Sequence, residues 1–285
     1  MKTGRKILVS VLAAITVMAC VSGCSSGKPA YENTQQLLEI NDEIEYSALA
    51  TEFARFDAVD TDHHVVQGGW YDGEYFYVCM YQNDNIDSRV ILTKIDKDGK
   101  IVRKSGLLDL DHANNLTYNS KINKFVVSHC QCNDEDRYSD YSFVDPVSFK
   151  ITQTGTLSRP FFSMAYCAAK DMYASGEWAG GVLDIWDGDL NVTSSYDEVV
   201  SDETTSQGVF ADEEHIWFVR SGKNGSQPQI RVYDWQGNLR HVIEIYGMSV
   251  EPESITIVNG EIYVICNNED YTGGIVYSLR LLEAK

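Results

Sequence analysis

The stretch that decides the fold is Gln67-Gly-Gly-Trp-Tyr-Asp-Gly-Glu-Tyr-Phe-Tyr-Val78, which has the pattern of a short strand, a turn and a strongly apolar strand. Two clear copies follow later in the chain, at Gln207–Val219 and Glu253–Val264. Two weaker copies, Asn114–Val127 and Phe162–Tyr173, lie between them. The starts of the five copies are separated by steps of 47, 48, 45 and 46 residues. A fixed period in the 40s with several strands per unit is typical of β-propeller blades.

Turn signals recur at matching places in the units. In the first unit we expect strands at 65–70, 75–81, 88–96 and 101–108, with a tight Asp-Gly hairpin at Asp96–Lys100 between the last two. Equivalent hairpins are expected in later units, at Asp145–Phe149, Asp187–Asn191 and Asp234–Asn238. The repeat therefore extends to four strands per unit.

The two ends of the repeat region complement each other. The last unit is short by one strand, and the stretch 45–57 precedes the first unit without a unit of its own. The sequence predicts an all-β chain folded as a single β-propeller of five four-stranded blades, in which this N-terminal strand closes the ring. Such closure removes free sheet edges. A six-bladed ring would need strands that the sequence does not show.

The units resemble the blades of bacterial extracytoplasmic β-propeller proteins of the NHL and YVTN type. The resemblance rests on the Gly-led apolar second strands, such as Gly260-Glu-Ile-Tyr-Val264, and on Asp-x-x-Gly hairpins such as Asp96–Gly99. It covers nearly all of the chain after the N-terminal segment. Propellers host lectins, glycosidases, lyases, esterases and scaffolds, so function has to be argued from a site. Five-bladed glycosidases begin their first blade with His-Asp-Pro, whereas this chain has Asp60-Thr-Asp-His-His64.

The N-terminus predicts export and a lipid anchor. Three basic residues precede an apolar stretch, 7–18, that is too short to span a bilayer, as in secretory signals. Val21-Ser-Gly-Cys24 then resembles the lipobox of bacterial lipoproteins, which implies a diacylglycerol on the Cys24 sulfur, with fatty acids such as palmitate. We expect a signal peptide at 1–23, the lipidated cysteine and tether at 24–44, and the propeller domain at 45–285. The alternative is an ordinary cleaved signal followed by a free cysteine.

Composition limits the partners. Removal of residues 1–23 leaves 20 basic and 42 acidic residues, a net charge of −22. A surface this acidic argues against nucleic acid as a partner. We expect an extracytoplasmic monomer attached to the cell membrane at the bacterial surface, without cofactor or bound metal.

Beyond the N-terminal segment there are five cysteines, an odd number that cannot pair completely within one chain: Cys79, Cys130, Cys132, Cys167 and Cys266.

The channel mouth is the predicted site, because the first strand of every blade lines the channel and the preceding loops gather at one end. In this register we expect Gln67, Trp70, Asn114, Asn115, Tyr166 and Gln207 to contact a ligand. Amides offer both donors and acceptors, which suits neutral polar ligands. Glu253 and His112 are the candidate catalytic residues, since a carboxylate in a channel must be solvated, paired or functional.

Three functions remain open at this point. The first is a binding module for a small polar ligand, a glycan or a peptide at the channel mouth. The second is a hydrolase or lyase that uses Glu253 as acid or base, with His112 as its partner. Glycosidic cleavage needs two carboxylates at a defined separation, which a sequence does not give. The third is a protein-interaction scaffold.

Overall fold

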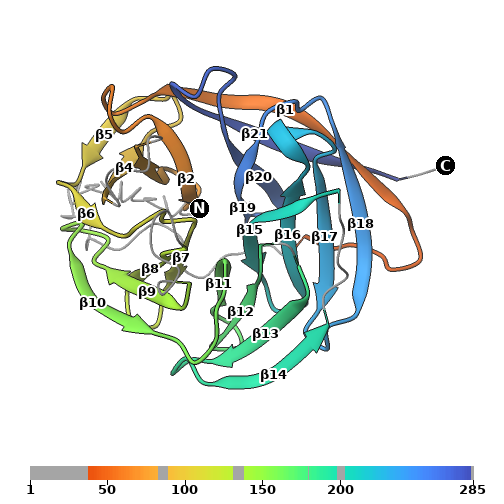
Figure 1. Cartoon of the computed structure of the whole chain (residues 1–285). Coiled ribbons are helices and arrows are strands. Elements are labelled where there is room, and N and C mark those ends of the chain that lie inside the picture. The colour runs from red at the N-terminus through yellow and green to blue at the C-terminus, as the bar shows by residue number, and fades with distance from the viewer. Residues whose placement is uncertain (1–37, 83–88, 131–137, 179, 198–202, 284–285) are drawn as a thin grey trace, which may run out of the picture.

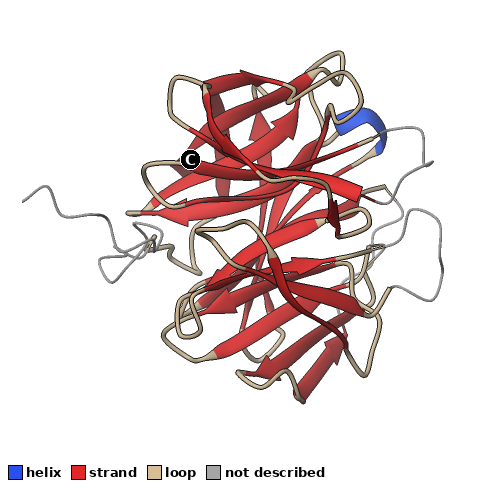
Figure 2. Ribbon diagram, turned by 90° about the vertical axis from the view of Figure 1, so that its left-hand side faces the viewer, coloured by secondary structure: helices blue, strands red, loops and turns tan. Residues whose placement is uncertain are grey.

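The computed structural model describes residues 38–82, 89–130, 138–178, 180–197 and 203–283. These residues form four β-sheets arranged around a central channel (Figure 1), and the largest sheet contains two blades. The chain is a single five-bladed β-propeller, and each blade has four strands that run from the channel outward. In the described part of the chain the only helical element is one 3₁₀ turn, Lys223–Gly225 (Figure 2). No helix in the described ranges is long and apolar enough to cross a membrane.

The blades follow one another in sequence, and the strands of each blade succeed one another from the channel outward. Blade 1 comprises β2 (Val65–Tyr71), β3 (Phe76–Tyr81), β4 (Arg89–Ile95) and β5 (Ile101–Lys104), with β6 (Leu108–Asp109) paired to β4. Blade 2 comprises β7 (Asn115–Asn119), β8 (Lys124–Ser128), β9 (Asp140–Val144) and β10 (Ile151–Thr156). Blade 3 comprises β11 (Ser163–Cys167), β12 (Met172–Gly176), β13 (Val182–Asp187) and β14 (Val192–Asp197). Blade 4 comprises β15 (Thr205–Ala211), β16 (His215–Ser221), β17 (Gln229–Asp234) and β18 (Leu239–Tyr246). Blade 5 comprises β19 (Pro252–Val258), β20 (Glu261–Asn267), β21 (Gly273–Glu283) and β1 (Tyr46–Asp57).

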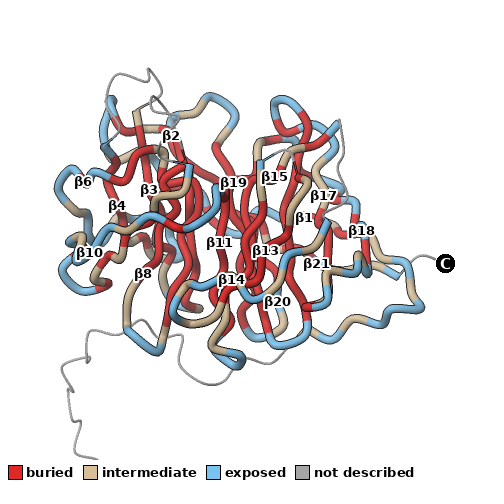
Figure 3. Tube along the Cα trace, turned by 60° about the horizontal axis from the view of Figure 1, so that its bottom comes forward, coloured by how far each residue is buried: buried red, intermediate tan, exposed pale blue. Residues whose placement is uncertain are grey.

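Burial follows the position of a strand within its blade. The inner strands β2, β7 and β19 are buried along their whole length, whereas the outer strand β18 alternates between buried and exposed residues. Figure 3 shows the same gradient, with buried chain at the centre and exposed chain at the rim. Side chains on both faces of the inner strands must therefore be apolar or have hydrogen-bond partners. Only the outer strands show the alternation of buried and exposed residues that is typical of a half-exposed sheet.

Glycines allow the inner strands to approach each other closely. A Cβ on Gly208 would lie 2.7 Å from the Ser254 Cα of the next blade. A Cβ on Gly68 would lie 2.6 Å from the Ala113 carbonyl oxygen, which accepts the Gly68 N–H at 2.9 Å. Contacts between successive inner strands continue around the ring and include the pair β19 and β2. These glycines explain the Gln-Gly pair at the start of two of the repeats.

Aspartates fix the turns inside the blades. In the hairpins between the third and fourth strands, the side chains of Asp96, Asp145, Asp187 and Asp234 each accept backbone N–H groups two to four residues later. An aspartate that bonds its own turn in this way holds a tight hairpin. All four hairpins lie where the sequence predicts them.

Aromatic side chains fill the space between blades 1 and 2. The Trp70 ring lies 5.1 Å from Tyr118 and 5.8 Å from Phe125, centroid to centroid. Trp70 is only 3% exposed. Edge-on and tilted aromatic pairs at this spacing add to the stabilisation from burial. Trp70 thus joins two blades.

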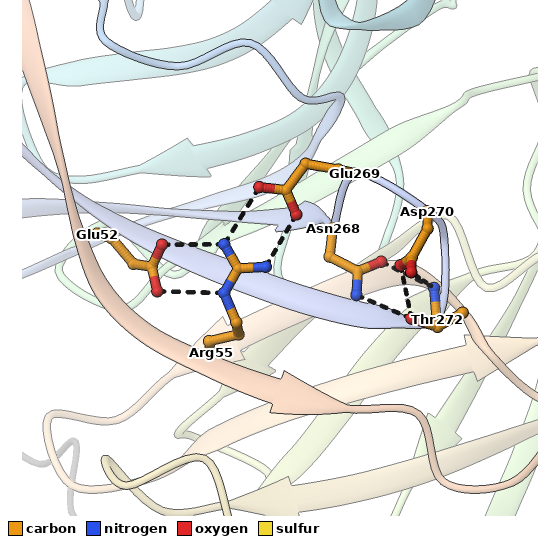
Figure 4. A network of polar contacts seen from close by, with 6 residues as sticks. All are labelled: Glu52, Arg55, Asn268, Glu269, Asp270 and Thr272. Atoms are coloured by element: carbon orange, nitrogen blue, oxygen red, sulfur yellow. Dashed lines mark hydrogen bonds and ion pairs between the residues drawn. The ribbon is translucent and has the colours of Figure 1, made fainter.

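The N-terminal strand closes the ring as predicted. Strand β1 pairs antiparallel with β21 over its whole length, from Asp57 opposite Gly273 to Tyr46 opposite Glu283. It also pairs parallel with β18 of blade 4 through residues 47–49, which the sequence does not predict. Blades 4 and 5 consequently form one eight-stranded sheet. At the other end of β1, the Arg55 guanidinium binds the carboxylates of Glu52 and Glu269, the latter at 2.8 Å (Figure 4).

Two further comparisons with the sequence concern a strand and the cysteines. The strand expected at 101–108 is divided into β5 and β6, because the Ser105 hydroxyl accepts the Leu92 N–H and replaces a backbone partner in the ladder. The four cysteines of the described ranges, Cys79, Cys130, Cys167 and Cys266, are buried, and Cys79, Cys167 and Cys266 are free. Cys24 and Cys132 lie outside the described residues.

Candidate functional site

A cavity of about 560 Å³ lies at one end of the channel. We call this end the mouth; it is where the first strands begin and the second strands end. The residues that line the cavity come from all five blades: Val65, Gln67, Tyr81, His112, Asn114, Cys130, Tyr138, Phe162, Trp178, Gln207, Glu251, Glu253, Asn267 and Tyr271. Five of the eight predicted site residues of the channel, Gln67, His112, Asn114, Gln207 and Glu253, are brought together here.

Antiparallel pairing within each blade explains why these residues meet. The start of a first strand lies opposite the end of the second strand, as Val65 does opposite Tyr81. Side chains from both strands, and from the loops that lead into them, therefore point to the same mouth. Among the lining residues that the sequence analysis did not place at the mouth, Tyr81 and Asn267 lie in second strands and Cys130 lies just after one. Following the hairpin register outward from the turn between the first and second strands of each blade would have found them.

Glu253 is the most deeply buried acid of the cavity, at 3% exposure. Its Oε1 accepts a hydrogen bond of 2.6 Å from Asn267 Nδ2. Burial, and secondarily the nearby Glu251 carboxylate, raise the pKa of Glu253 well above its ordinary value, while the bond from Asn267 acts in the opposite direction. The protonated form of Glu253 is thus favoured over a wider pH range than in an ordinary glutamate.

Glu251 is held at both carboxylate oxygens. Gln207 Nε2 donates to Oε1 at 2.9 Å, and the Tyr271 hydroxyl donates to Oε2 at 3.2 Å. Burial and the Glu251 carboxylate together raise the pKa of Tyr271 to about 12, so this hydroxyl remains a donor. One predicted residue, Gln207, therefore orients a second acid of the cavity, Glu251.

His112 packs its ring against Tyr81, with 4.5 Å between the centroids. Burial lowers the pKa of His112 to about 4. An imidazole with this pKa is neutral near pH 7 and adds no positive charge to the cavity. His112 and Glu253 line the same cavity, but their direct pairing remains a prediction.

The amides of the mouth differ in their roles. Asn114 Nδ2 donates to the carbonyl oxygens of Phe162 and Gln207, at 3.4 and 3.3 Å, and so ties three blades together. Asn267 bonds the backbone of Val66 through both ends of its amide. Gln67 is different: it is 5% exposed, and its buried Oε1 has no hydrogen-bond partner among the described residues.

Three predicted ligand-binding residues do not line the cavity. Trp70 is enclosed between blades 1 and 2, as described above. The Asn115 Oδ1 accepts the Met164 N–H at 3.3 Å, a contact between inner strands. The Tyr166 hydroxyl donates to Asp171 at 2.8 Å, beyond the far end of strand β11. Successive residues of an inner strand point to alternate sides and run away from the mouth, and a start position alone does not reveal this.

The described ranges contain no group of three or more His, Cys, Asp or Glu side chains arranged to hold a metal ion. The Asp60–His64 segment instead forms local bonds, such as the one of 3.1 Å between His63 Nδ1 and Asp60 Oδ1. The chemistry available at the mouth is that of two acids, a neutral imidazole, amides and aromatic rings.

Comparisons with known proteins support the fold. No protein-family model matches the chain, and no curated protein matches it. Among solved structures, the chain is similar to the glutaminyl cyclase of Myxococcus xanthus, with a TM-score of 0.58 and 11% identity over 85% of this chain and 100% of that one. It also matches the β-propeller domain of Cps50 (Swd1) from Myceliophteria thermophila, with a TM-score of 0.48 and 9% identity over 81% of this chain and 100% of that one. A member of the DUF4221 family from Bacteroides vulgatus gives a TM-score of 0.46 and 9% identity over 84% of this chain and 99% of that one. At these identities the likeness concerns the fold alone.

Proposed function

We propose that this propeller is a binding protein that holds a small polar ligand, a glycan or a peptide in the mouth cavity. The observation that carries the proposal is Gln67, which lines a cavity of about 560 Å³ and whose buried Oε1 has no hydrogen-bond partner among the described residues. A buried acceptor of this kind costs about 1–3 kcal/mol when nothing bonds to it, and a ligand that donates to it removes that cost. The cavity is also large enough for a small-molecule site.

A thermal-shift screen of residues 25–285 tests this proposal. The panel contains cell-wall sugars, other oligosaccharides, short peptides, amines and calcium. Because a ligand that binds only the folded state raises the melting temperature with its concentration, one class should stabilise the wild type. Gln207→Ala should weaken the shift, since it frees the Glu251 carboxylate from its donor. Gln236→Ala is the matched control: this exposed glutamine lies in the β17–β18 hairpin, outside the cavity. The proposal fails if no class shifts the wild type, or if both variants respond as the wild type does.

The alternative is an acid–base enzyme at the same mouth. One observation favours it: the pKa of Glu253 is raised beside a second carboxylate, Glu251, which is a common arrangement for a general acid and its companion. The panel includes peptides with N-terminal glutamine, because the structural neighbour of highest similarity reported above is a glutaminyl cyclase. Turnover followed by mass spectrometry decides between the two functions. An enzyme would lose turnover in Glu253→Gln, whereas a binding protein would retain affinity.

We further propose that the protein is a lipoprotein of the bacterial cell surface, anchored through Cys24, and that its mouth is directed away from the membrane. The position at which the N-terminal segment joins the propeller supports this orientation. Strand β1 ends at Asp57, which pairs with Gly273 and therefore lies near the cavity residue Tyr271. Its first residue, Tyr46, pairs with Glu283 at the opposite end of the strand. The preceding residue Asp42 pairs with Arg240, just after the β17–β18 hairpin at the far end of blade 4. The chain at Asp42 therefore enters the propeller on the face opposite the mouth.

A further inference from the structure

Most hydrogen-bond donors identified in the cavity wall are already engaged within the protein. Asn267 Nδ2 donates to the Val66 carbonyl oxygen and to Glu253. Gln207 Nε2 and the Tyr271 hydroxyl both donate to Glu251. These donors are committed to holding the two acids in place.

Acceptors, in contrast, remain available. Gln67 lines the cavity, and its buried Oε1 has no donor within the described part of the chain. Glu251 receives one bond at each oxygen, whereas a carboxylate has about four acceptor positions. A ligand that complements this wall must therefore donate hydrogen bonds.

The fixed charge of the cavity has one sign. The described residues that line it include Glu251 and Glu253 but neither lysine nor arginine. His112 is neutral near pH 7, because burial lowers its pKa to about 4. The cavity belongs to a chain whose formal net charge is −19. A cation is attracted by this arrangement, and an anion is repelled.

Five aromatic side chains also line the cavity: Tyr81, Tyr138, Phe162, Trp178 and Tyr271. Trp178 is 55% exposed, and Tyr138 is exposed as well, which is unusual for large rings and places both where the cavity opens. Aromatic faces attract ammonium groups, and Trp does so most strongly. The wall is thus aromatic at its opening and acidic at its base.

We propose that the ligand of the mouth cavity carries a protonated amine. Glu251 is the counter-charge, Gln67 Oε1 accepts an ammonium N–H, and the aromatic rings enclose the attached carbon skeleton. This inference rests on the proposed binding function and narrows its ligand class. It concerns a free amine on a small molecule or on a peptide, and the two sources share this chemistry.

Isothermal titration of residues 25–285 at pH 7 and low salt tests the inference with matched probes. Phenethylamine carries the charge and N–H donors, N-acetylphenethylamine keeps the ring without the charge, and phenethyltrimethylammonium keeps the charge without N–H groups. Phenethylamine is expected to bind at least about tenfold more tightly than either other probe. A free-amine dipeptide and its N-acetylated form then distinguish a peptide source from a small-molecule source.

Variants locate the effect. Glu251→Gln should weaken phenethylamine about tenfold or more and leave the acetylated probe nearly unchanged. Glu213→Gln is the control, because it removes the same charge from an exposed turn residue outside the cavity. If the acetylated or the trimethylated probe binds as tightly as phenethylamine, the assignment of a protonated amine is wrong. The proposed binding function would still hold in that case, because the probes would bind saturably at the mouth. Absence of any binding in this titration and in the thermal-shift panel would remove both.

Discussion

Two tryptophans show how differently single residues serve this protein. Trp70 lies between blades 1 and 2 against Tyr118 and Phe125, whereas Trp178 lies exposed at the mouth cavity. A buried ring contributes to stability, and a ring at the opening of a cavity has its apolar face free for a ligand. The two residues therefore separate folding from recognition.

Substitution of each tryptophan by alanine should give opposite results. We expect Trp70→Ala to lower the free energy of unfolding by about 3–5 kcal/mol, because it empties an inter-blade contact. Trp178→Ala should change it by no more than about 0.5 kcal/mol, as is usual at exposed positions. Denaturant unfolding measures both, and ligand affinity should fall in the second variant. A large loss of stability in Trp178→Ala would show that this ring is structural.

Glu253 gives a prediction about pH. Its folded pKa is raised above the ordinary value of 4.5, so the folded state binds the proton more tightly than the unfolded state. Stability from this group is therefore complete below about pH 4.5 and is lost as the pH rises toward the folded pKa, at up to roughly 1.4 kcal/mol per unit. Glu253→Gln removes this loss and should be more stable than the wild type at pH 8 but not at pH 4.

The comparison of Glu253→Gln with the wild type cancels the contribution of His112. The pKa of His112 is lowered from 6.5 to about 4, so its contribution runs in the opposite sense and increases as the pH rises between those values. Denaturant midpoints at several pH values provide the measurement. Parallel pH profiles for the two proteins would contradict a raised pKa at Glu253.

At the scale of elements, β1 is the strand on which closure depends. It covers the edge of β21 and, through residues 47–49, the edge of β18. The Arg55–Glu269 pair joins it to the loop between β20 and β21, where the guanidinium lowers the pKa of Glu269 to about 2 (Figure 4). This pair is exposed, and paired strands and buried side chains such as Ala48 and Phe56 account for more of the closure.

Removal of β1 should open the ring. We expect a chain that starts at residue 59 to expose two strand edges and to aggregate or lose cooperative unfolding. A chain that starts at residue 38 retains β1 and is the control. Size-exclusion chromatography and circular dichroism measure the difference. A monomeric, cooperatively folded chain lacking β1 would show that the closure is dispensable.

The sequence predicts the strands and turns better than it predicts the individual residues of the site. The repeat period, the aspartate hairpins and the missing last strand predict the five blades and the role of β1, because each depends on local pattern. The parallel contact of β1 with β18 depends on how blades 4 and 5 meet in space, and no local pattern encodes it. Local pattern likewise predicts Gln67, Gln207 and Glu253 at the mouth, whereas Tyr271, which donates to Glu251 from the loop between β20 and β21, could not be predicted.

At the scale of the molecule, the two faces of the propeller differ in role. The cavity lies on the mouth face, and the N-terminal segment with Asp42 and Tyr46 contacts the propeller on the opposite face. Thirteen residues lie between Cys24 and Leu38, the first described residue. A lipid on Cys24 would hold the far face near the bilayer and leave the mouth open to the surroundings.

Fluorophores placed at positions 138 and 236 test this orientation. Tyr138 lines the cavity, and Gln236 lies in a hairpin on the opposite face. In vesicles that carry the lipidated protein, nitroxide-labelled headgroups should quench the fluorophore at 236 more strongly than the one at 138. Stronger quenching at 138 would mean that the mouth faces the membrane.

The fluorescence of Trp178 provides the most direct test of ligand binding at the mouth. Trp178 is the only tryptophan among the described residues of the cavity wall, and it is exposed to solvent. Titration of residues 25–285 with phenethylamine, or with the class that gives the largest thermal shift, should produce a saturable change in emission. That change should disappear in Trp178→Phe, although the ligand should still raise the melting temperature of this variant. An unchanged emission in the wild type, or a saturable change that persists in Trp178→Phe, would contradict a ligand site at the channel mouth.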